Sequence, residues 1–513
     1  MPDFYRDKKL RNLLIIFLSS LPVIIHLYTN FFAGYGYFRD ELYYIACSNR
    51  LDTGYVDQPP FSILILYINR ILFGDSLFAL RFIPAVTSGL TVFISCLMTR
   101  EFGGKTFSMI LCSIAVTLAP VYLGMNAFYS MNCFDILFWT LAFYLIMKII
   151  SESKQSYWIY LGIVFGLGLM NKIGILWLGF GFLTALLLSD KRRELLTIKP
   201  YLCALIALTI FTPYILWNWQ NDFAHIEFIK NATSGKYSGL NIIDFISGQF
   251  LNVNPISAFI WIPGLYYLLF NHQGIKYRIL AIIYITVFII LILNGHSKAE
   301  YLAPAYVMLF ASGSTFIDKK TVVRSRWIRY VIMYPLIITG ILFAPLAIPV
   351  LSVETYIVYA KQLGRTPSSS ENKELSELPQ FYADMHGWEE MAKNVSEVYL
   401  SLPREERLRT IVFGRNYGEA AAMEFYRNLY PIPRVISSHN NYWLWGYPQI
   451  EDPVIIIIGG NKEDHEKLFE TVDEKLTHIS KYSMPYENNL PIFIAGKMKV
   501  PISEEWSKIK NYD

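Results

Sequence analysis

The chain has 513 residues, of which 54% are hydrophobic and only 17% are charged. A soluble protein of this size carries about a quarter charged residues, so the composition excludes an ordinary soluble globular protein. The net charge of +4 is small and falls in short loops. It therefore bears on membrane topology and argues against nucleic acid as a partner.

Apolar runs of roughly the length that crosses a bilayer as a helix, about 17–22 residues, repeat through the first two thirds of the chain. They predict about eleven transmembrane spans. These lie near residues 12–30, 80–99, 106–123, 131–150, 157–170, 173–189, 201–219, 255–270, 279–293, 301–317 and 331–351. Residues 61–73 are apolar but too short to span, so they predict a helix in the outer membrane interface.

Basic residues set the orientation of these spans. Arg6, Lys8, Lys9 and Arg11 precede the first span, which predicts a cytoplasmic N-terminus. No small-residue cleavage site follows, so the first span is expected to be a retained anchor. If residues 61–73 do not cross the membrane, the other strongly basic loops lie on the cytoplasmic side together with the N-terminus. An odd number of spans then places the C-terminal end outside.

The composition changes near residue 352. We expect a transmembrane domain over 1–351, a polar Ser/Glu-rich linker over 352–380, and a soluble domain over 381–513. Residues 409–414, 453–460 and 490–496 predict strands, and 420–429 predicts a helix. Strands alternating with helical patterns indicate a small α/β domain outside the membrane.

The first outer loop carries two adjacent acids, Asp40 and Glu41, where the chain meets water. A carboxylate there can act as a general base that takes a proton from an attacking hydroxyl. It can equally be a solvated loop residue or a helix cap. We treat Asp40 and Glu41 as catalytic candidates.

Asp135 lies about one turn inside an otherwise apolar span. A carboxylate in the membrane is costly unless it faces a polar cavity, so a functional role is the default interpretation. The alternative is an acid that reaches water from a helix N-terminus, helped by the helix dipole. The predicted topology puts Asp135 level with Asp40, so we expect the two acids to converge on one site.

Two lysines, Lys172 and Lys298, lie at predicted outer turns, against the positive-inside trend. An anionic phosphate is a natural partner for them, and Arg39 and His296 could add to the set. Cations that hold a phosphate opposite a base are what glycosyl transfer from a lipid phosphate needs. Residues 437–446 are aromatic and polar, and predict either a sugar-binding or membrane-facing loop or packing of the soluble domain onto the membrane part.

Several motifs together give a family resemblance. They are Arg39-Asp40-Glu41-Leu42-Tyr43-Tyr44, Val56-Asp57-Gln58-Pro59-Pro60, Phe73-Gly74-Asp75-Ser76, Tyr129-Ser130-Met131-Asn132-Cys133-Phe134-Asp135, Asn171-Lys172 and Lys298-Ala299-Glu300-Tyr301. The chain resembles bacterial members of glycosyltransferase family 39, which includes relatives of protein O-mannosyltransferases and of lipid A aminoarabinose transferases. The resemblance implies the helical, polytopic C-type glycosyltransferase fold.

The resemblance also implies a polyprenyl-phosphate sugar donor, inversion at the anomeric carbon, Asp40 as base and Asp135 as a second acid in the cavity. The substrate-binding candidates are Arg39, Tyr43, Asp57, Gln58, Asn132, Asn171, Lys172, His296, Lys298 and Tyr301. The aminoarabinose transferases carry a lysine where this chain has Gln58, which leaves phosphate binding to Lys298 and Lys172. Some relatives bind a divalent metal at the acidic cluster, which Asp40, Glu41 and Asp135 could form; no other cofactor is implied.

These features favour an inner-membrane glycosyltransferase that acts on an outward-facing lipid, glycan or protein acceptor among membrane lipids. The alternatives are a transporter or flippase of lipid-linked sugars, or a relative that only binds them. Transporters usually show internal repeats and polar residues near mid-membrane. Here the polar residues cluster at one face and no repeat is visible, which disfavours transport.

Overall fold

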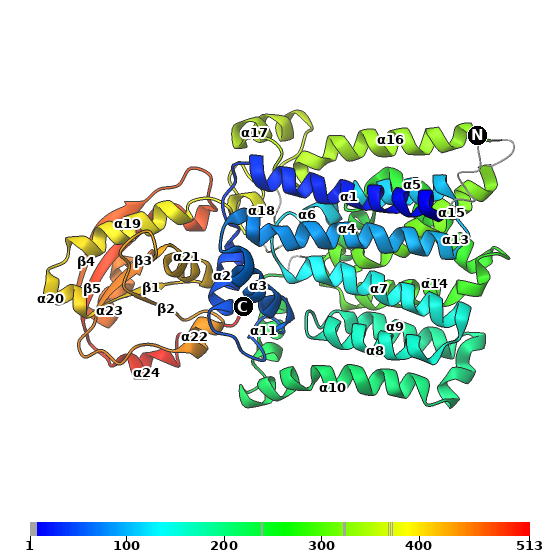
Figure 1. Ribbon diagram of the computed structural model, residues 1–513. Helices are drawn as coiled ribbons and strands as arrows, with labels where there is room; N and C mark the ends of the chain where they lie inside the picture. Colours follow the sequence, from blue (N-terminus) through cyan, green and yellow to red (C-terminus); the bar gives the residue numbers. More distant parts are fainter. Residues whose placement is uncertain (1–7, 238–239, 322–324, 368, 370, 372) are drawn as a thin grey trace.

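The computed structural model describes residues 8–237, 240–321, 325–367, 369, 371 and 373–513. Arg6, one of the basic residues that predict a cytoplasmic N-terminus, lies outside the described residues, as do residues 368, 370 and 372 of the predicted linker. A bundle of long helices occupies one end of the molecule, and a sheet with its covering helices occupies the other (Figure 1).

The helices of the bundle run side by side along its long axis (Figure 1). They are α1 (Lys8–Phe32), α4 (Leu77–Glu101), α5 (Thr106–Thr117), α7 (Met131–Glu152), α8 (Gln155–Leu169), α9 (Ile175–Leu187), α10 (Lys199–Gln220), α13 (Ala258–Phe270), α14 (Arg278–Asn294), α15 (Tyr306–Thr321) and α16 (Trp327–Phe343). Short 3-10 turns join some of them: η1 (Asp190–Leu196), η2 (Pro255–Ser257), η3 (Ile275–Tyr277), η4 (Ala299–Ala305) and η5 (Ala344–Leu346).

Six of the described helices are long and apolar enough to cross a membrane, and a bent pair, Ile242–Leu251 with Pro255–Phe270, would make a seventh. Four shorter apolar helices accompany them, including the hairpin α8–α9. The helices α1, α10 and α16 expose large apolar side chains such as Ile16, Leu205 and Ile338. An apolar surface of this kind suits lipid and not water. The chain is therefore a multi-pass membrane protein, and the count of eleven spans stays a prediction.

Close helix packing in the bundle depends on small residues. A Cβ at Gly162 would lie 2.7 Å from the carbonyl oxygen of Cys203, and one at Gly166 would lie 2.7 Å from Cβ of Ile210. The two glycines, one turn apart, let α8 lie directly against α10.

Short helices gather at the end of the bundle that faces the sheet: α2 (Arg39–Ser48), α3 (Phe61–Phe73), α6 (Pro120–Met125), α11 (Ala224–Ser234), α17 (Val353–Gln362) and α18 (Gln380–Ala383) (Figure 1). The helix α12 (Ile242–Leu251) belongs to the bent pair above. The predicted short helix over 61–73 is confirmed with those bounds. The segment between the predicted spans 201–219 and 255–270 contains the helices α11 and α12, and the predicted linker over 352–380 begins with α17. The domain boundaries stay a prediction.

The C-terminal part is a five-stranded sheet in the order β2-β1-β3-β5-β4. Its strands are β1 (Thr410–Gly414), β2 (Arg434–Ser437), β3 (Val454–Ile458), β4 (Phe469–His478) and β5 (Leu490–Met498). Its helices are α19 (Trp388–Ser401), α20 (Arg404–Leu408), α21 (Tyr417–Tyr426), α22 (Asn441–Trp445), α23 (Lys462–Leu468) and α24 (Ile502–Trp506), with a 3-10 turn η6 (Pro485–Glu487).

The strand β1 pairs in parallel with β2 and β3, and β5 runs antiparallel between β3 and β4. The strand β3 is buried along its whole length, as its run of isoleucines predicts for a strand covered on both faces. The predicted α/β fold of this part is confirmed.

Candidate active site at the end of the helix bundle

The helix α2 holds the two acids of the first loop in its first turn. Phe38 caps the helix, and the Glu41 carboxylate accepts a hydrogen bond from the Phe38 amide at 2.9 Å. Acidic side chains suit this position because the N-terminus of a helix carries a partial positive charge. Adjacent residues on a helix point about 100° apart, so Asp40 and Glu41 face different surroundings.

Glu41 is fully buried. Its Oε1 lies 2.9 Å from Nε of Arg81 and its Oε2 lies 2.8 Å from Nη2 of the same residue. Oε1 also accepts a hydrogen bond from the amide of Tyr129 at 2.8 Å. Both oxygens are thus engaged by donors that join α2, α4 and the segment before α7. These contacts give Glu41 a structural role, which agrees better with the helix-cap alternative than with a role as general base.

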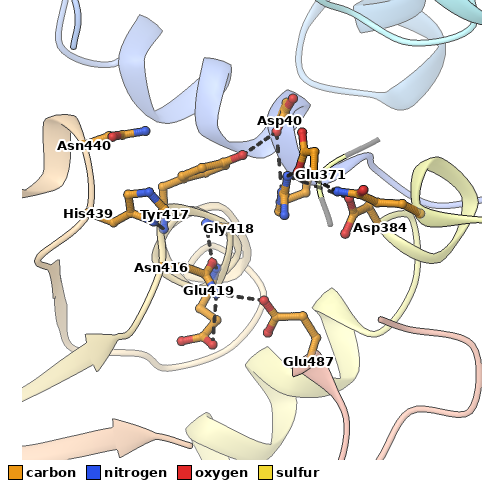
Figure 2. Close-up of polar contacts among 12 residues, drawn as sticks. Asp40, Glu371, Asp384, Asn416, Tyr417, Gly418, Glu419, His439, Asn440 and Glu487 are labelled. Atoms are coloured by element: carbon orange, nitrogen blue, oxygen red, sulfur yellow. Dashed lines mark hydrogen bonds and ion pairs between the residues drawn. The ribbon is translucent and has the colours of Figure 1, made fainter. Parts of the chain in front are cut away.

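Asp40 has the opposite environment, because 35% of its side chain is exposed. Its Oδ1 accepts a hydrogen bond from the hydroxyl of Tyr417 at 2.9 Å and lies 3.6 Å from Nε of Arg39 (Figure 2). Both contacts involve Oδ1, and the described contacts of Oδ2 include no hydrogen bond. An exposed carboxylate with one open oxygen can accept a proton from a substrate.

Arg39 is buried among acids and tyrosines. Its Nη1 donates to the hydroxyl of Tyr486 at 2.6 Å, and its Nη2 lies 3.7 Å from Glu371 and 3.9 Å from Asp384. Burial raises the pKa of Asp384 to about 7 in spite of Arg39. Arg39, predicted to bind substrate, therefore connects the start of α2 to the C-terminal part of the chain.

Tyr43, Asp57 and Gln58 lie beside this group. The hydroxyl of Tyr43 is 3.2 Å from Oδ1 of Asp57 and 3.2 Å from Oδ1 of Asn441. Burial raises the pKa of Asp57 to about 7. Gln58 is fully buried, and neither polar atom of its amide has a hydrogen-bond partner among the described residues. Such an amide can serve a ligand that the chain itself does not supply.

Asp135 belongs to a second group, one turn into α7. Nζ of Lys172 is 2.8 Å from Oδ1 of Asn132 and 3.6 Å from Oδ2 of Asp135. Asn171 donates to the carbonyl of Met131 at 2.9 Å, which fixes the turn between α8 and α9 against α7. The lysine partner explains how a carboxylate is tolerated in this span.

Lys298 and Tyr301 lie between the two groups. Nζ of Lys298 lies 4.7 Å from the ring centre of Tyr237 and 3.7 Å from Glu371, while Nζ of Lys172 lies 5.3 Å from the ring centre of Tyr301. Burial disfavours the charge of Lys298, but Tyr237, Glu300, Glu371 and Asp40 outweigh it and raise the pKa of this lysine. His296 is exposed on the same loop.

The predicted topology makes Asp40 and Asp135 converge on one site. The described contacts include none between the two carboxylates; the side chains of Lys172, Tyr301, Tyr237 and Lys298 lie between their groups. Within the described part of the chain, no three His, Cys, Asp or Glu side chains are placed to hold a metal ion. Because Arg81 also donates to both carboxylate oxygens of Glu41, the trio Asp40, Glu41 and Asp135 does not fit a metal ion.

Sequence reasoning missed several residues of this region: Arg81, Glu371, Asp384 and Tyr486. An arginine inside the apolar run 77–101 is a signal that could have pointed to Arg81. The others lie far along the chain from the motifs of the first loop. Only the fold brings them together. Residues 437–446 pack onto the membrane part, because Asn441 accepts from the amide of Val56 at 2.8 Å.

The arrangement defines a polytopic membrane protein with a partly exposed acid among cations at one end of its bundle. The sequence model of the family described as dolichyl-phosphate-mannose-protein mannosyltransferase matches residues 57–217. Lipid A galacturonosyltransferase RgtD of Rhizobium johnstonii is 21% identical over 279 residues, which is 53% of this chain and 58% of that protein. An undecaprenyl phosphate-alpha-4-amino-4-deoxy-L-arabinose arabinosyl transferase of Pseudomonas savastanoi pv. phaseolicola is 28% identical over 33% of this chain and 32% of its own length.

The solved structures extend the likeness to nearly the whole chain. ArnT from Cupriavidus metallidurans bound to undecaprenyl phosphate matches with a TM-score of 0.59 and 11% identity, over 94% of this chain and 97% of ArnT. The Archaeoglobus fulgidus oligosaccharyltransferase in the apo form matches with a TM-score of 0.51 and 14% identity, over 82% and 64%. The chain thus has the helical fold of these enzymes, and the resemblance to glycosyltransferase family 39 is confirmed. The sequence matches span between about a third and three fifths of the curated relatives' length.

Proposed function

We propose that this protein is a glycosyltransferase of the inner membrane that moves one sugar from a polyprenyl phosphate to a hydroxyl of a lipid, glycan or protein acceptor. The observation that carries the proposal is Asp40, a carboxylate with an open Oδ2 at the end of the bundle that interacts electrostatically with the cation Lys298. The names of the relatives support it, since they act on lipid A or use undecaprenyl-phosphate sugars.

In the proposed reaction, Oδ2 of Asp40 takes the proton of the acceptor hydroxyl. The acceptor oxygen forms a bond to the anomeric carbon as the bond from that carbon to the phosphate oxygen breaks, and the electron pair leaves with the polyprenyl phosphate. Attack opposite the leaving group inverts the anomeric centre. Lys298 and Lys172 stabilise the phosphate as its charge grows, which is where fixed cations accelerate transfer most.

Other residues of the site take supporting roles in this proposal. Asp135 and Asn132 hold the ammonium of Lys172 in place. The unpaired amide of Gln58 is available to the sugar or phosphate. Glu41 is assigned to architecture and not to proton transfer, because Arg81 occupies both of its oxygens.

The proposed orientation puts the N-terminus in the cytoplasm and the site, with residues 381–513, on the outer side. The basic ends of α15 and of the loop over 190–193 support it, because they lie at the opposite end of the bundle from α2 (Figure 1).

The test is transfer of radiolabelled sugar from a panel of polyprenyl-phosphate sugars in membranes with and without the protein. Transfer to an acceptor that depends on the protein supports an enzyme and names its donor. Binding or movement of lipid-linked sugar without transfer from any donor would instead favour the binding or translocating alternatives.

A further inference from the structure

The parallel half of the C-terminal sheet points its carboxyl ends toward α2. The strand β1 lies between β2 and β3, so the order of the parallel strands reverses at β1. In open α/β sheets, ligands bind outside the carboxyl ends of the strands at such a reversal. Here the loops that leave this edge, after Gly414 and after Ser437, lead to Tyr417 and Asn441 at the bundle.

Three contacts join this edge to the segment that holds Asp40. The hydroxyl of Tyr417 donates to Oδ1 of Asp40, and Asn441 accepts from the hydroxyl of Tyr43 and from the Val56 amide. Gly418 allows the close approach, because a Cβ there would lie 2.6 Å from Cγ of Arg39. Figure 2 shows Tyr417 extending from α21 toward Asp40.

The side chain of Tyr417 is fixed by its own helix and by the rings that pack against it. The side chain of Asn416 caps α21 by accepting from the amides of Gly418 and Glu419 at 2.8 and 3.0 Å. The Tyr417 ring lies 4.7 Å from the ring of Tyr43 and 4.9 Å from that of His439, centre to centre. Only 8% of Tyr417 is exposed, so its ring has little freedom to turn.

The hydroxyl of Tyr417 is a permanent donor. Burial raises the pKa of Tyr417 well above its ordinary range. The phenol is therefore protonated at neutral pH and can donate its proton to Oδ1 of Asp40. A carboxylate whose one oxygen is fixed in this way presents the other in a set direction.

We propose that Tyr417 is a positioning residue for Asp40: its hydroxyl fixes Oδ1 so that Oδ2 faces the acceptor hydroxyl, and the C-terminal domain thereby completes the active site. This inference rests on the proposed function. Proton transfer is sensitive to alignment, and a misplaced general base loses much of its effect. The donor phosphate, which Lys298 and Lys172 hold in our proposal, does not depend on Tyr417.

The test is Tyr417→Phe, which removes the oxygen and keeps the ring. The matched control is Tyr430→Phe in the same domain, whose exposed hydroxyl donates to Glu389 at 2.9 Å. We expect Tyr417→Phe to lower kcat by about 10–100-fold, with the KM for the polyprenyl-phosphate sugar and the melting temperature in detergent close to wild type. Tyr430→Phe should keep all three values.

The outcomes separate the two proposals. No transfer by wild-type protein from any donor would overturn the proposed function, and the role of Tyr417 with it. Transfer by wild type, with kcat of Tyr417→Phe within twofold of it, would overturn the role of Tyr417 alone. A loss of kcat that came with an equal loss of donor binding and of melting temperature would show that Tyr417 only docks the domain, which also contradicts the proposal.

Discussion

Glu41 and Arg81, 40 residues apart in the chain, form a double ion pair at 2.8 and 2.9 Å with side chains that are 0% and 1% exposed. The pair ties α2 to α4 and leaves Asp40 as the partly exposed acid of the two. Two adjacent carboxylates thus have separate tasks, because the helix turns them into different surroundings.

Glu41→Gln should destabilise the protein strongly, because it leaves the Arg81 charge buried without its counter-ion. Breaking such a pair costs about 3–5 kcal/mol. Thermal unfolding in detergent measures the effect. The control is Asp75→Asn, which breaks the pair with Arg70 where Asp75 is 43% exposed and should cost about 0–1 kcal/mol. Equal, small shifts in the two variants would contradict an architectural role for Glu41.

The two lysines should differ in their effect on the donor. Lys298 lies 3.7 Å from Glu371 and interacts electrostatically with Asp40, whereas Lys172 already has Asn132 and Asp135 as partners. We expect Lys298→Ala to weaken binding of a polyprenyl-phosphate sugar about tenfold or more, a change of about 1.4 kcal/mol, and Lys172→Ala to weaken it less. Equilibrium binding of labelled donor measures both. If neither variant changed the affinity, the proposed phosphate site would be wrong.

Asp384 should make stability depend on pH. Burial raises its pKa to about 7 from an ordinary value of 3.8, so the folded state holds a proton that the unfolded chain releases. The contribution of Asp384 to the free energy of unfolding therefore falls as pH rises from about 4 to about 7. We predict that Asp384→Asn melts close to wild type at pH 4.5 and a few degrees above it at pH 7.5. The pKa of Asp57 is also raised to about 7. Because Asp57 is present in both wild type and Asp384→Asn, its effect cancels in the difference between their melting temperatures. A constant difference across this range would contradict the prediction.

The orientation of the chain can be tested independently of chemistry. A reporter that is active only outside the cytoplasm, fused after Asp513, should be active, and a reporter that fluoresces only in the cytoplasm should be dark. The reverse pattern would place Asp40 on the inner side and overturn the outward-facing acceptor. Fusions to the loop between α9 and α10, near Arg192, provide the opposite control.

The membrane class, the short helix over 61–73 and three strands of the C-terminal part, β1, β3 and β5, could be predicted from the sequence, because each depends on local apolar pattern and length. The strands β2 and β4 were not predicted. The role of the first loop could be predicted only as far as its residue types. The ion pair between Arg81 and Glu41 joins residues 40 positions apart in the chain. The hydrogen bond from Tyr417 to Asp40 joins residues 377 positions apart. Neither contact leaves a periodic signal in the chain.

The different partners of Asp40 and Asp135 have the same cause. The topology put Asp135 and Asp40 at one level of the membrane, but level does not fix lateral position. Because α7 packs against the turn between α8 and α9, Asp135 forms an ion pair with Lys172. The start of α2 instead directs Asp40 toward the C-terminal sheet. Pattern alone could not distinguish these neighbourhoods.

The most direct test of the account is transfer of labelled sugar by purified Asp40→Asn protein, with the donor found in the panel, beside wild type and the control Asp222→Asn on the turn after α10. General-base catalysis contributes about 10²–10⁴-fold. The account predicts a loss of this size in kcat for Asp40→Asn, with donor binding retained, and near wild-type turnover for Asp222→Asn. Wild-type turnover by Asp40→Asn would contradict the assignment of Asp40 as the base.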